Sequence, residues 1–412
     1  MIAAFFEATI RSAAQLINIV RLSGLRGGEV YGAGRPTVVG VFRAASGIGS
    51  GARLLYQTLA DAGLEPSLVD LTDLLARGQA LVDWSPSVDP APDDGRGPII
   101  VHLNAPEVAY ALKALGPQNL KGRLRIAYWA WELERLPRSW VYSKGYFHEI
   151  WAPSDYTAAA IRGEDVTCQV RSVGYALPAS AQTFTDPQVW RDRLAPNGEL
   201  IVFNAFDFRS SMERKNPVAA IEIFRRAMRG RTDAILVLKQ GSLESSLTEV
   251  RRLEEIINGD PRIRLIDQVL DSGSMQSLIA AADIYLSPHR CEGFGLMLAQ
   301  SLLAGKEVIM TKWSGNMDFG DLPGVHSIEF KLVPVNDPSG IYSARHGRWA
   351  EPDPEHGASL LRSVLDFSVS KRADRSEAIA AAATRHFSVT NWVDRLGDRF
   401  RACAENPFRA SS

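Results

Sequence analysis

The stretch SPHRCEGFGLMLAQSLLAGKEVIMTKWSGN, residues 287–316, joins two apolar runs through a glycine-containing turn and a helix. The run DIYLSP that enters it predicts one buried strand, and EVIMTKW within it predicts the next. Gly305 stands where the helix between these strands must end. A strand, a helix and a further strand in this order form a parallel β-α-β unit, so the stretch indicates an α/β fold.

The same alternation runs through the rest of the chain in two series of strands. Residues 173–190, which lie between the two series, contain turn residues and no strong period, so we place the hinge there. The sequence therefore predicts two Rossmann-like domains whose parallel sheets face each other across a cleft. The predicted strands are RPTVVGVF, PSLVDL, GPIIVHLN, LRIAYWAW and EIWAPS in the first series, and ELIVFNAFD, DAILVLKQ, IRLID, DIYLSP and EVIMTKW in the second.

These patterns divide the chain into four segments. We expect an N-terminal helix over residues 1–30, a first Rossmann-like domain over 31–185, a second over 186–385 and a final helix over 386–412. The final segment contains FSVTNWVDRLGDRFRACAENP, which is typical of an amphipathic helix. Within the second domain, the helix NPVAAIEIFRRAMRG has clear end signals, since Asn216 can cap its first turn.

The N-terminal helix has two interpretations. Its apolar run is interrupted by Glu7, Arg11 and Arg21, whereas a spanning helix needs about 20 mostly apolar residues. No small-residue cleavage site follows a clean apolar core, so we do not expect a signal peptide. The helix either packs on the body or a partner, or lies on a membrane surface with Arg11, Arg21 and Arg26 near the headgroups.

Composition excludes several classes of function. The 412 residues carry a net charge of −1, and a nucleic-acid partner would leave a basic footprint. The three cysteines are Cys168, Cys291 and Cys403, which are far apart and form no C-x-x-C. We therefore expect neither a disulfide framework nor a zinc site, and we expect a reducing compartment such as the cytoplasm.

The turn in the opening stretch predicts an anion site. Free backbone N–H groups and the helix dipole face whatever lies above the turn, and Gly293 and Gly295 let the backbone approach a ligand. Glu292 can accept hydrogen bonds from sugar hydroxyls. Gln300 lies eight positions on, about two helical turns, and we expect it on the same face. The alternative is that Glu292 only stabilises its helix and Gln300 is solvated.

A second group of charges lies in FNAFDFRSSMERKNP. Arg209, Arg214 and Lys215 precede a helix N-terminus, and cations beside such a terminus make a diphosphate pocket. The alternative is a solvated basic loop. Many sugar-nucleotide enzymes hold a divalent cation with a D-x-D pair, but this chain contains no D-x-D, so these cations would neutralise the diphosphate themselves.

A glycine loop in the first domain supports a competing hypothesis. Gly47, Gly49 and the following residues fit G-x-G-x-x-A, and Asp70 falls near the position of the acid in a dinucleotide fingerprint. However, the loop begins several residues after its strand, whereas a fingerprint has its first glycine almost at the strand end. A plain tight turn is a further interpretation.

Residues at predicted strand ends complete the candidate site. His102 could contact the transferred sugar or the acceptor, or it could be structural. Asn104 begins the next helix. Glu132 could accept the proton of an acceptor hydroxyl, and Trp131 beside it could stack on a sugar or belong to the core. We expect Asn316, in SGN, on a loop at the same edge of the sheet, with an ordinary turn as its alternative.

These motifs resemble those of glycosyltransferase family four, which comprises retaining enzymes with the GT-B fold. HR-x-EGFGL and AGK-x-VI-x-T-x-x-SGN-x-DF are similar to a bacterial polysaccharide-assembly branch of that family, and the resemblance covers nearly the whole chain. WAWELERLP, EIWAPSDYT, RKNP and WAEPD also fit it. One position departs from the family pattern, because Gln300 stands where the second glutamate of the family's E-x7-E motif normally holds the donor ribose.

The resemblance implies a role for each of these positions. It places Glu292 at the donor sugar ring, and it assigns Arg209 and Lys215 to the donor phosphates without a metal ion. Arg214 is an alternative to Arg209, because the loop length differs from the simplest family pattern. It implies that the loop at Gly47 approaches the donor phosphates or the acceptor, and that the last helix crosses back to the N-terminal domain. The expected catalytic residues are Glu292, Lys215, Arg209 and His102; donor-binding residues are Arg214, Gly293, Phe294, Gly295, Leu296, Gln300, Asn316, Gly47 and Gly49; acceptor-binding residues are Glu132, Trp131 and Asn104.

We therefore expect a retaining, metal-independent transferase that needs no cofactor beyond a nucleotide-diphosphate sugar as co-substrate. The expected acceptor is a saccharide or a lipid-linked saccharide in polysaccharide or glycolipid biosynthesis, at the inner face of the plasma membrane if the N-terminal helix binds there. Two alternatives stay open. The glycine loop favours an NAD-dependent oxidoreductase or epimerase, and Gln300 keeps a non-catalytic GT-B-like binding protein under consideration.

Overall fold

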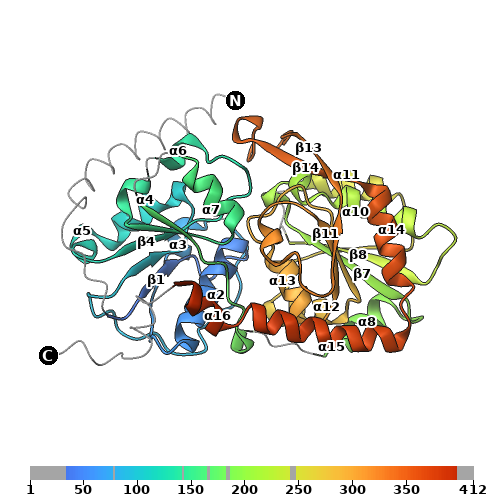
Figure 1. The fold of residues 1–412 in the computed structure, drawn as a ribbon, viewed down its shortest axis with the longest axis horizontal. Helices are drawn as coiled ribbons and strands as arrows, with labels where there is room; N and C mark the ends of the chain where they lie inside the picture. Colours follow the sequence, from blue (N-terminus) through green and yellow to red (C-terminus); the bar gives the residue numbers. More distant parts are fainter. Residues whose placement is uncertain are drawn as a thin grey trace.

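The computed structural model describes residues 34–77, 79–141, 143–164, 168–181, 186–241 and 247–396. The helix expected over residues 1–30, and residues 397–412 of the expected final helix, lie outside this part of the chain. Two α/β domains lie side by side, each with a central sheet between helices (Figure 1). This arrangement confirms the predicted pair of Rossmann-like domains.

The N-terminal domain is built on a parallel six-stranded sheet in the order β2-β1-β3-β4-β5-β6. Its central strands are short apolar runs, whereas the edge strand β6 is polar, and β1 is buried throughout because helices cover the sheet. The elements are β1 (Thr37–Gly40), α2 (Gly47–Asp61), β2 (Ser67–Asp70), α3 (Thr72–Leu75), β3 (Ile99–Val101), α4 (Ala105–Leu115), α5 (Pro117–Leu120), β4 (Arg125–Tyr128), α6 (Arg138–Val141), β5 (Glu149–Ala152), α7 (Asp155–Arg162) and β6 (Gln169–Ser172).

The C-terminal domain repeats the plan with a parallel sheet in the order β12-β11-β10-β7-β8-β9. As predicted, the side chain of Asn216 caps α10 by accepting a hydrogen bond from the N–H of Ala219. The elements are α8 (Gln188–Leu194), β7 (Leu200–Phe206), α9 (Met212–Lys215), α10 (Pro217–Ala227), β8 (Ala234–Gln240), α11 (Leu247–Ile257), β9 (Ile263–Asp267), α12 (Ser272–Ala281), β10 (Ile284–Ser287), α13 (Leu296–Leu303), β11 (Glu307–Thr311), β12 (Val325–Ile328) and α14 (Pro354–Leu365).

An antiparallel hairpin that the sequence analysis did not predict follows the second sheet. It pairs β13 (Phe330–Pro334) with β14 (Arg348–Pro352). The loop between these strands, residues 335–347, reaches toward the N-terminal domain, where Tyr342 and His346 contact the segment after β4. The hairpin therefore adds a second link between the domains, on the side away from the C-terminal helices (Figure 1).

The C-terminal helices form the other link. Helix α15 (Val369–His386) packs along the C-terminal domain, and α16 (Val389–Leu396) lies against the N-terminal domain (Figure 1). The indole of Trp392 packs at 6.0 Å from that of Trp151 and donates to the carbonyl oxygen of Gly174. The chain thus crosses back to the first domain, as the resemblance implied, within the residues that the structure describes.

Candidate active site

Loops that follow the carboxyl ends of strands in both domains meet at one interface. The hydroxyl of Ser154, after β5, donates to the carbonyl oxygen of Gly293, after β10, at 2.6 Å. The N–H of Asp155 donates to the carboxylate of Asp318 at 2.9 Å. Because ligands of open α/β sheets bind at this edge, the interface is the expected place for a site.

Three charged side chains converge at the turn after β10. Glu292 is only 8% exposed, and its carboxylate accepts from Arg214 at 3.2 Å and from the Nζ of Lys215. Burial by itself would raise the pKa of Glu292, but the charges of Lys215 and Arg214 outweigh it and lower that pKa to about 2. Glu292 is therefore ionised at neutral pH and held between two cations.

The two cations owe their position to a strained backbone. Ser211 and Asn216 both have positive φ, at 69° and 55°, and they bracket the single turn of α9. The hydroxyl of Ser211 accepts from the N–H of Arg214 and donates to the carboxylate of Asp337, which lies in the hairpin loop. Positive φ at two non-glycine residues costs free energy and is typical of functional sites.

Arg214 is the most enclosed member of the group. Its guanidinium donates to the carbonyl oxygens of Ser210 and Cys291 and lies 5.7 Å from the ring centre of Tyr342. Arg209 has a different environment, because Asp207 pairs with it at 2.7 Å and it donates to the carbonyl oxygen of Ala45 at 3.2 Å. The structure therefore brings Arg214 and Lys215 to Glu292, whereas Arg209 spans the two domains near the glycine loop.

The turn itself leaves a helix N-terminus without a side-chain cap. Gly295 has φ +95 and is the N-cap of α13, so its backbone adopts a conformation that favours glycine. Gly293 lies against the N-terminal domain, where an added Cβ would come within 3.3 Å of the carbonyl oxygen of Trp131. The ring of Phe294 packs against Tyr175 and Phe319, so this side chain belongs to the core between the domains.

The expected helical spacing between Glu292 and Gln300 is not observed. Helix α13 begins at Leu296, so the eight positions between the two residues do not form two helical turns. The turn at Gly295 sets the direction of the helix instead. Both Leu296 and Gln300 are half-buried.

Asn316 is a fully buried residue of a network that the sequence analysis only partly found. Its side-chain oxygen lies 2.9 Å from the Nε2 of His289, and its amide donates to the carbonyl oxygen of Thr311 at 3.0 Å. His289 in turn lies 3.1 Å from the hydroxyl of Ser287. The network fixes the two loops on either side of Glu292. His289 stands inside the quoted motif, three residues before Glu292, and this position was its only signal.

The glycine loop of the N-terminal domain does not have the surroundings of a dinucleotide site. Asp70 forms an ion pair with Arg43 at 2.8 Å and also accepts from the N–H groups of Phe42 and Thr72. Gly49 is buried, and an added Cβ would lie 2.3 Å from the carbonyl oxygen of Ala44. Gly47 is exposed, with no atom within 4 Å of such a Cβ. The carboxylate that would bind a ribose is thus already engaged with the loop.

His102 lies beneath the first turn of α2. Its Nε2 is 2.9 Å from the hydroxyl of Tyr175, and its ring stacks on Tyr128 at 4.6 Å. Burial lowers the pKa of His102 to about 4, so the ring is neutral at neutral pH. The imidazole fits beneath the helix because residue 51 is glycine, where an added Cβ would come within 2.6 Å of the ring.

The candidate acceptor residues lie in the segment after β4. Glu132 is four positions beyond the end of β4, which is shorter than the predicted strand. Its carboxylate accepts from the hydroxyl of Tyr342 at 2.9 Å. Trp131 is buried and packs 5.5 Å from the ring of Tyr342, while Asn104 accepts from the N–H of Ala130. Tyr342 therefore links Glu132 to Arg214, and no sequence pattern pointed to it.

The described residues contain neither a candidate metal site nor a candidate membrane-spanning helix. Within that part of the chain, no group of three or more His, Cys, Asp or Glu side chains is placed to hold a metal ion. No helix among the same residues has both the length and the apolar character needed to cross a membrane.

Two Rossmann-like domains that meet at the carboxyl ends of their parallel strands have the architecture of the GT-B fold. Residues 208–345 match the family model described as glycosyl transferases group 1. The matched residues include the cluster of Arg214, Lys215 and Glu292. A comparison with curated protein sequences gave no match.

Solved structures share the fold at low sequence identity. HepE from Anabaena, in complex with UDP and glucose, is 13% identical, with a TM-score of 0.62 over 89% of this chain and 99% of its own. A glycosyltransferase from Rickettsia africae is 13% identical, with a TM-score of 0.62 over 92% and 100%. WaaG, a glycosyltransferase involved in lipopolysaccharide biosynthesis, is 13% identical, with a TM-score of 0.57 over 88% and 100%. These likenesses confirm the GT-B fold.

Proposed function

We propose that this chain transfers a sugar from a nucleotide-diphosphate sugar to a saccharide or lipid-linked saccharide acceptor, with retention of anomeric configuration and without a metal ion. The observation that carries the proposal is the convergence of Arg214 and Lys215 on Glu292 beside the uncapped N-terminus of α13. Cations and a helix N-terminus bind a diphosphate, and a carboxylate binds sugar hydroxyls. No cofactor besides the donor is proposed.

Donor binding would replace the ion pair between Lys215 and Glu292 with contacts from each residue to the donor. Lys215 is 20% exposed, so it can turn from Glu292 toward a donor phosphate. Glu292 would then accept hydrogen bonds from the hydroxyls of the donor sugar. Arg214 would hold Glu292 in place through its bond at 3.2 Å while its charge stabilises the departing diphosphate.

In the proposed reaction, the acceptor hydroxyl oxygen bonds to the anomeric carbon as the bond from that carbon to the phosphate oxygen breaks. The hydroxyl proton passes to the departing phosphate, which leaves as part of the nucleoside diphosphate. The new bond forms on the face that the phosphate leaves, so the configuration is retained. Arg209, which reaches Ala45 of the N-terminal domain, and the loop at Gly47 would contact the donor or the acceptor between the domains. His102 would support this region from within the core, because its ring is fully buried.

The likeness to HepE and WaaG supports the proposed substrate classes. The HepE structure holds UDP and glucose, and WaaG is involved in lipopolysaccharide biosynthesis. We propose an equivalent role in building a polysaccharide or glycolipid, in the cytoplasm or at the inner face of its membrane. Asp70 is paired with Arg43, so the structure does not favour the NAD-dependent oxidoreductase or epimerase. It contains no observation that favours a non-catalytic binding protein among the described residues.

The test is a thermal-shift screen of UDP-, GDP-, ADP- and TDP-sugars, with NAD(H) included and EDTA present throughout. A ligand that binds the native state must raise the melting temperature. The donor found this way is then incubated with saccharide acceptors, and the anomeric configuration of the product is read by NMR. We expect a shift with one sugar nucleotide and a retained product. A shift with NAD(H) alone, or an inverted product, would overturn the proposal.

A further inference from the structure

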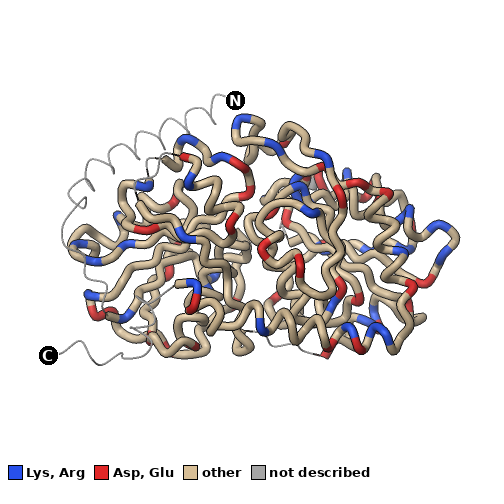
Figure 2. The backbone as a smooth tube through the Cα atoms, in the orientation of Figure 1, with Lys and Arg blue, Asp and Glu red and all other residues tan. Residues whose placement is uncertain are grey.

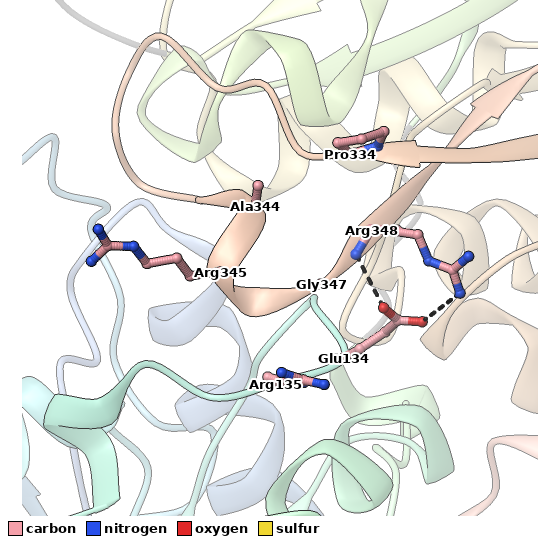
Figure 3. Close-up of a pocket in the computed structure, with 7 residues that line it drawn as sticks. All are labelled: Glu134, Arg135, Pro334, Ala344, Arg345, Gly347 and Arg348. Carbon is pink, nitrogen blue, oxygen red and sulfur yellow. Dashed lines mark hydrogen bonds and ion pairs between the residues drawn. The ribbon is translucent and has the colours of Figure 1, made fainter.

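A cavity of about 590 Å³ lies between the two domains beside the candidate acceptor residues (Figure 3). One wall is the segment after β4, with Glu134 and Arg135, and the other is the end of the hairpin loop. We call this cavity the arginine pocket. Its lining residues are Glu134, Arg135, Pro334, Ala344, Arg345, Gly347 and Arg348.

The charges around the arginine pocket are mainly positive. Three arginines line it against a single carboxylate, that of Glu134. That carboxylate is already engaged, because it accepts from the N–H of Arg348 at 3.0 Å and pairs with the guanidinium of Arg348 at 3.7 Å. Among the described residues, neither the guanidinium of Arg135 nor that of Arg345 has a hydrogen-bond or ion-pair partner. Elsewhere, basic and acidic residues are interspersed along both domains (Figure 2).

The two walls of the pocket are fixed to each other by the backbone. The N–H of Arg135 donates to the carbonyl oxygen of His346 at 2.9 Å, and the carbonyl oxygen of Arg135 accepts from the indole of Trp131 at 2.8 Å. Gly347 has φ +123, and an added Cβ there would lie 2.6 Å from the carboxylate of Glu134. The pocket is therefore built by specific contacts and requires a glycine at this position.

The pocket shares both walls with the candidate active site. Glu132 lies two residues before Glu134, and Tyr342, which donates to it, lies three residues before Arg345. The ring of Tyr342 also contacts Arg214, which pairs with Glu292. A molecule seated among the arginines could thus extend along these walls toward Glu132.

We propose that the arginine pocket binds a phosphate or diphosphate group carried by the acceptor. Guanidinium groups bind phosphate oxygens in pairs of charge-assisted hydrogen bonds, whereas a neutral saccharide needs no such concentration of cations. The assignment of the ligand to the acceptor rests on the proposed function, while the binding of a phosphate group does not. A phosphate borne by a lipid and one borne by a soluble sugar phosphate present the same chemistry to the pocket.

His346 is a local reporter of anion binding in this pocket. Its ring lies 5.6 Å from that of Trp131, and burial together with the charge of Arg345 lowers its pKa. An anion bound beside Arg345 would offset that charge and raise the pKa of His346. The experiment follows the imidazole signal of His346 by NMR in the full-length protein, with His346→Gln to assign it, during titration with inorganic pyrophosphate.

We expect the signal to respond in the wild type and in the control Arg229→Gln/Arg264→Gln, which removes two exposed arginines outside the pocket. In Arg135→Gln/Arg345→Gln, we expect the dissociation constant for pyrophosphate, obtained from the shift of this signal, to be at least about tenfold higher. An equal response in the pocket variant, or no response in the wild type, would overturn the proposal. The titration contains no donor, so its outcome is independent of whether the chain transfers a sugar.

Sedimentation with vesicles of equimolar phosphatidylcholine and phosphatidylglycerol distinguishes the two sources of phosphate. Vesicle binding by the wild type that Arg135→Gln/Arg345→Gln loses would assign the group to a lipid. A response to pyrophosphate together with equal vesicle binding by both proteins would assign it to a soluble acceptor. Either result supports the pocket as a phosphate site.

Discussion

Each domain places a glycine-containing segment after a strand at the interface, and the two segments differ in what surrounds them. In the N-terminal domain, the glycines begin α2 itself, Gly49 packs against the carbonyl oxygen of Ala44, and the nearby carboxylate of Asp70 is paired with Arg43. In the C-terminal domain, the turn before α13 has Glu292 between two cations that come from α9. The local motif alone does not define a donor site, because the charges that make one come from another part of the chain.

The first prediction concerns the rate of sugar transfer and the C-terminal turn. Glu292→Gln should reduce sugar transfer by about a hundredfold or more, because the uncharged amide binds the sugar hydroxyls and Lys215 less strongly. The matched change in the other domain, Asp70→Asn, should leave the rate within about threefold, because it disturbs a half-exposed ion pair. Both are read from initial rates with the identified donor. Equal losses in the two variants would contradict the assignment.

The second prediction concerns stability as a function of pH. The pKa of Glu292 is lowered to about 2 from 4.5, so its ion pairs stabilise the fold fully above pH 4.5 and progressively less as the pH falls toward 2. A lowering of this size corresponds to on the order of 3 kcal/mol. Urea unfolding of the wild type and Glu292→Gln across this range should show a difference at pH 7 that shrinks below pH 4.5. A difference independent of pH would show that the carboxylate charge is not the cause.

A third prediction concerns the packing of the glycines at the start of α2. Gly49→Ala places a Cβ 2.3 Å from the carbonyl oxygen of Ala44, so the backbone must shift. We expect a loss of about 1–3 kcal/mol in the free energy of unfolding. Gly47→Ala, two residues away in open space, should change it by no more than about 1 kcal/mol. Denaturant titrations compare the pair, and equal values would mean that the packing of this turn does not depend on Gly49.

The fourth prediction is that Gln300→Glu changes the kinetics only slightly. This substitution introduces the glutamate that glycosyltransferase family four normally has at this position. Gln300 is half-buried on α13 and can bond hydroxyl groups both as donor and as acceptor. We expect the KM for the donor to change by less than about tenfold and kcat to stay within that range. Steady-state kinetics with the identified donor test this. A gain in kcat of several orders of magnitude would mean that the glutamine disables the site.

The sequence carried enough information for five strands of each sheet, but not for the edge strands β6 and β12. Strong apolar runs bounded by helix signals, such as the cap at Asn216, are local features and were predicted directly. The grouping of Glu292 with Arg214 was also within reach, because both positions lie after strands of one sheet.

The parts that the sequence did not predict depend on contacts between distant segments. Tyr342 joins Glu132 to Arg214 only because the unpredicted hairpin carries its loop to the other domain. The expected two helical turns between Glu292 and Gln300 are not formed, because α13 begins only at Leu296, after Gly295 with its positive φ. Neither feature produces a periodic pattern.

We propose that the cluster at the C-terminal turn binds the donor diphosphate without a metal ion. The decisive experiment is a calorimetric titration of the donor's nucleoside diphosphate, in EDTA, into the wild type, Lys215→Gln and Asp70→Asn. We expect binding by the wild type and Asp70→Asn, and binding at least about tenfold weaker by Lys215→Gln. Binding that requires a divalent cation, or that is unchanged in Lys215→Gln, would contradict it.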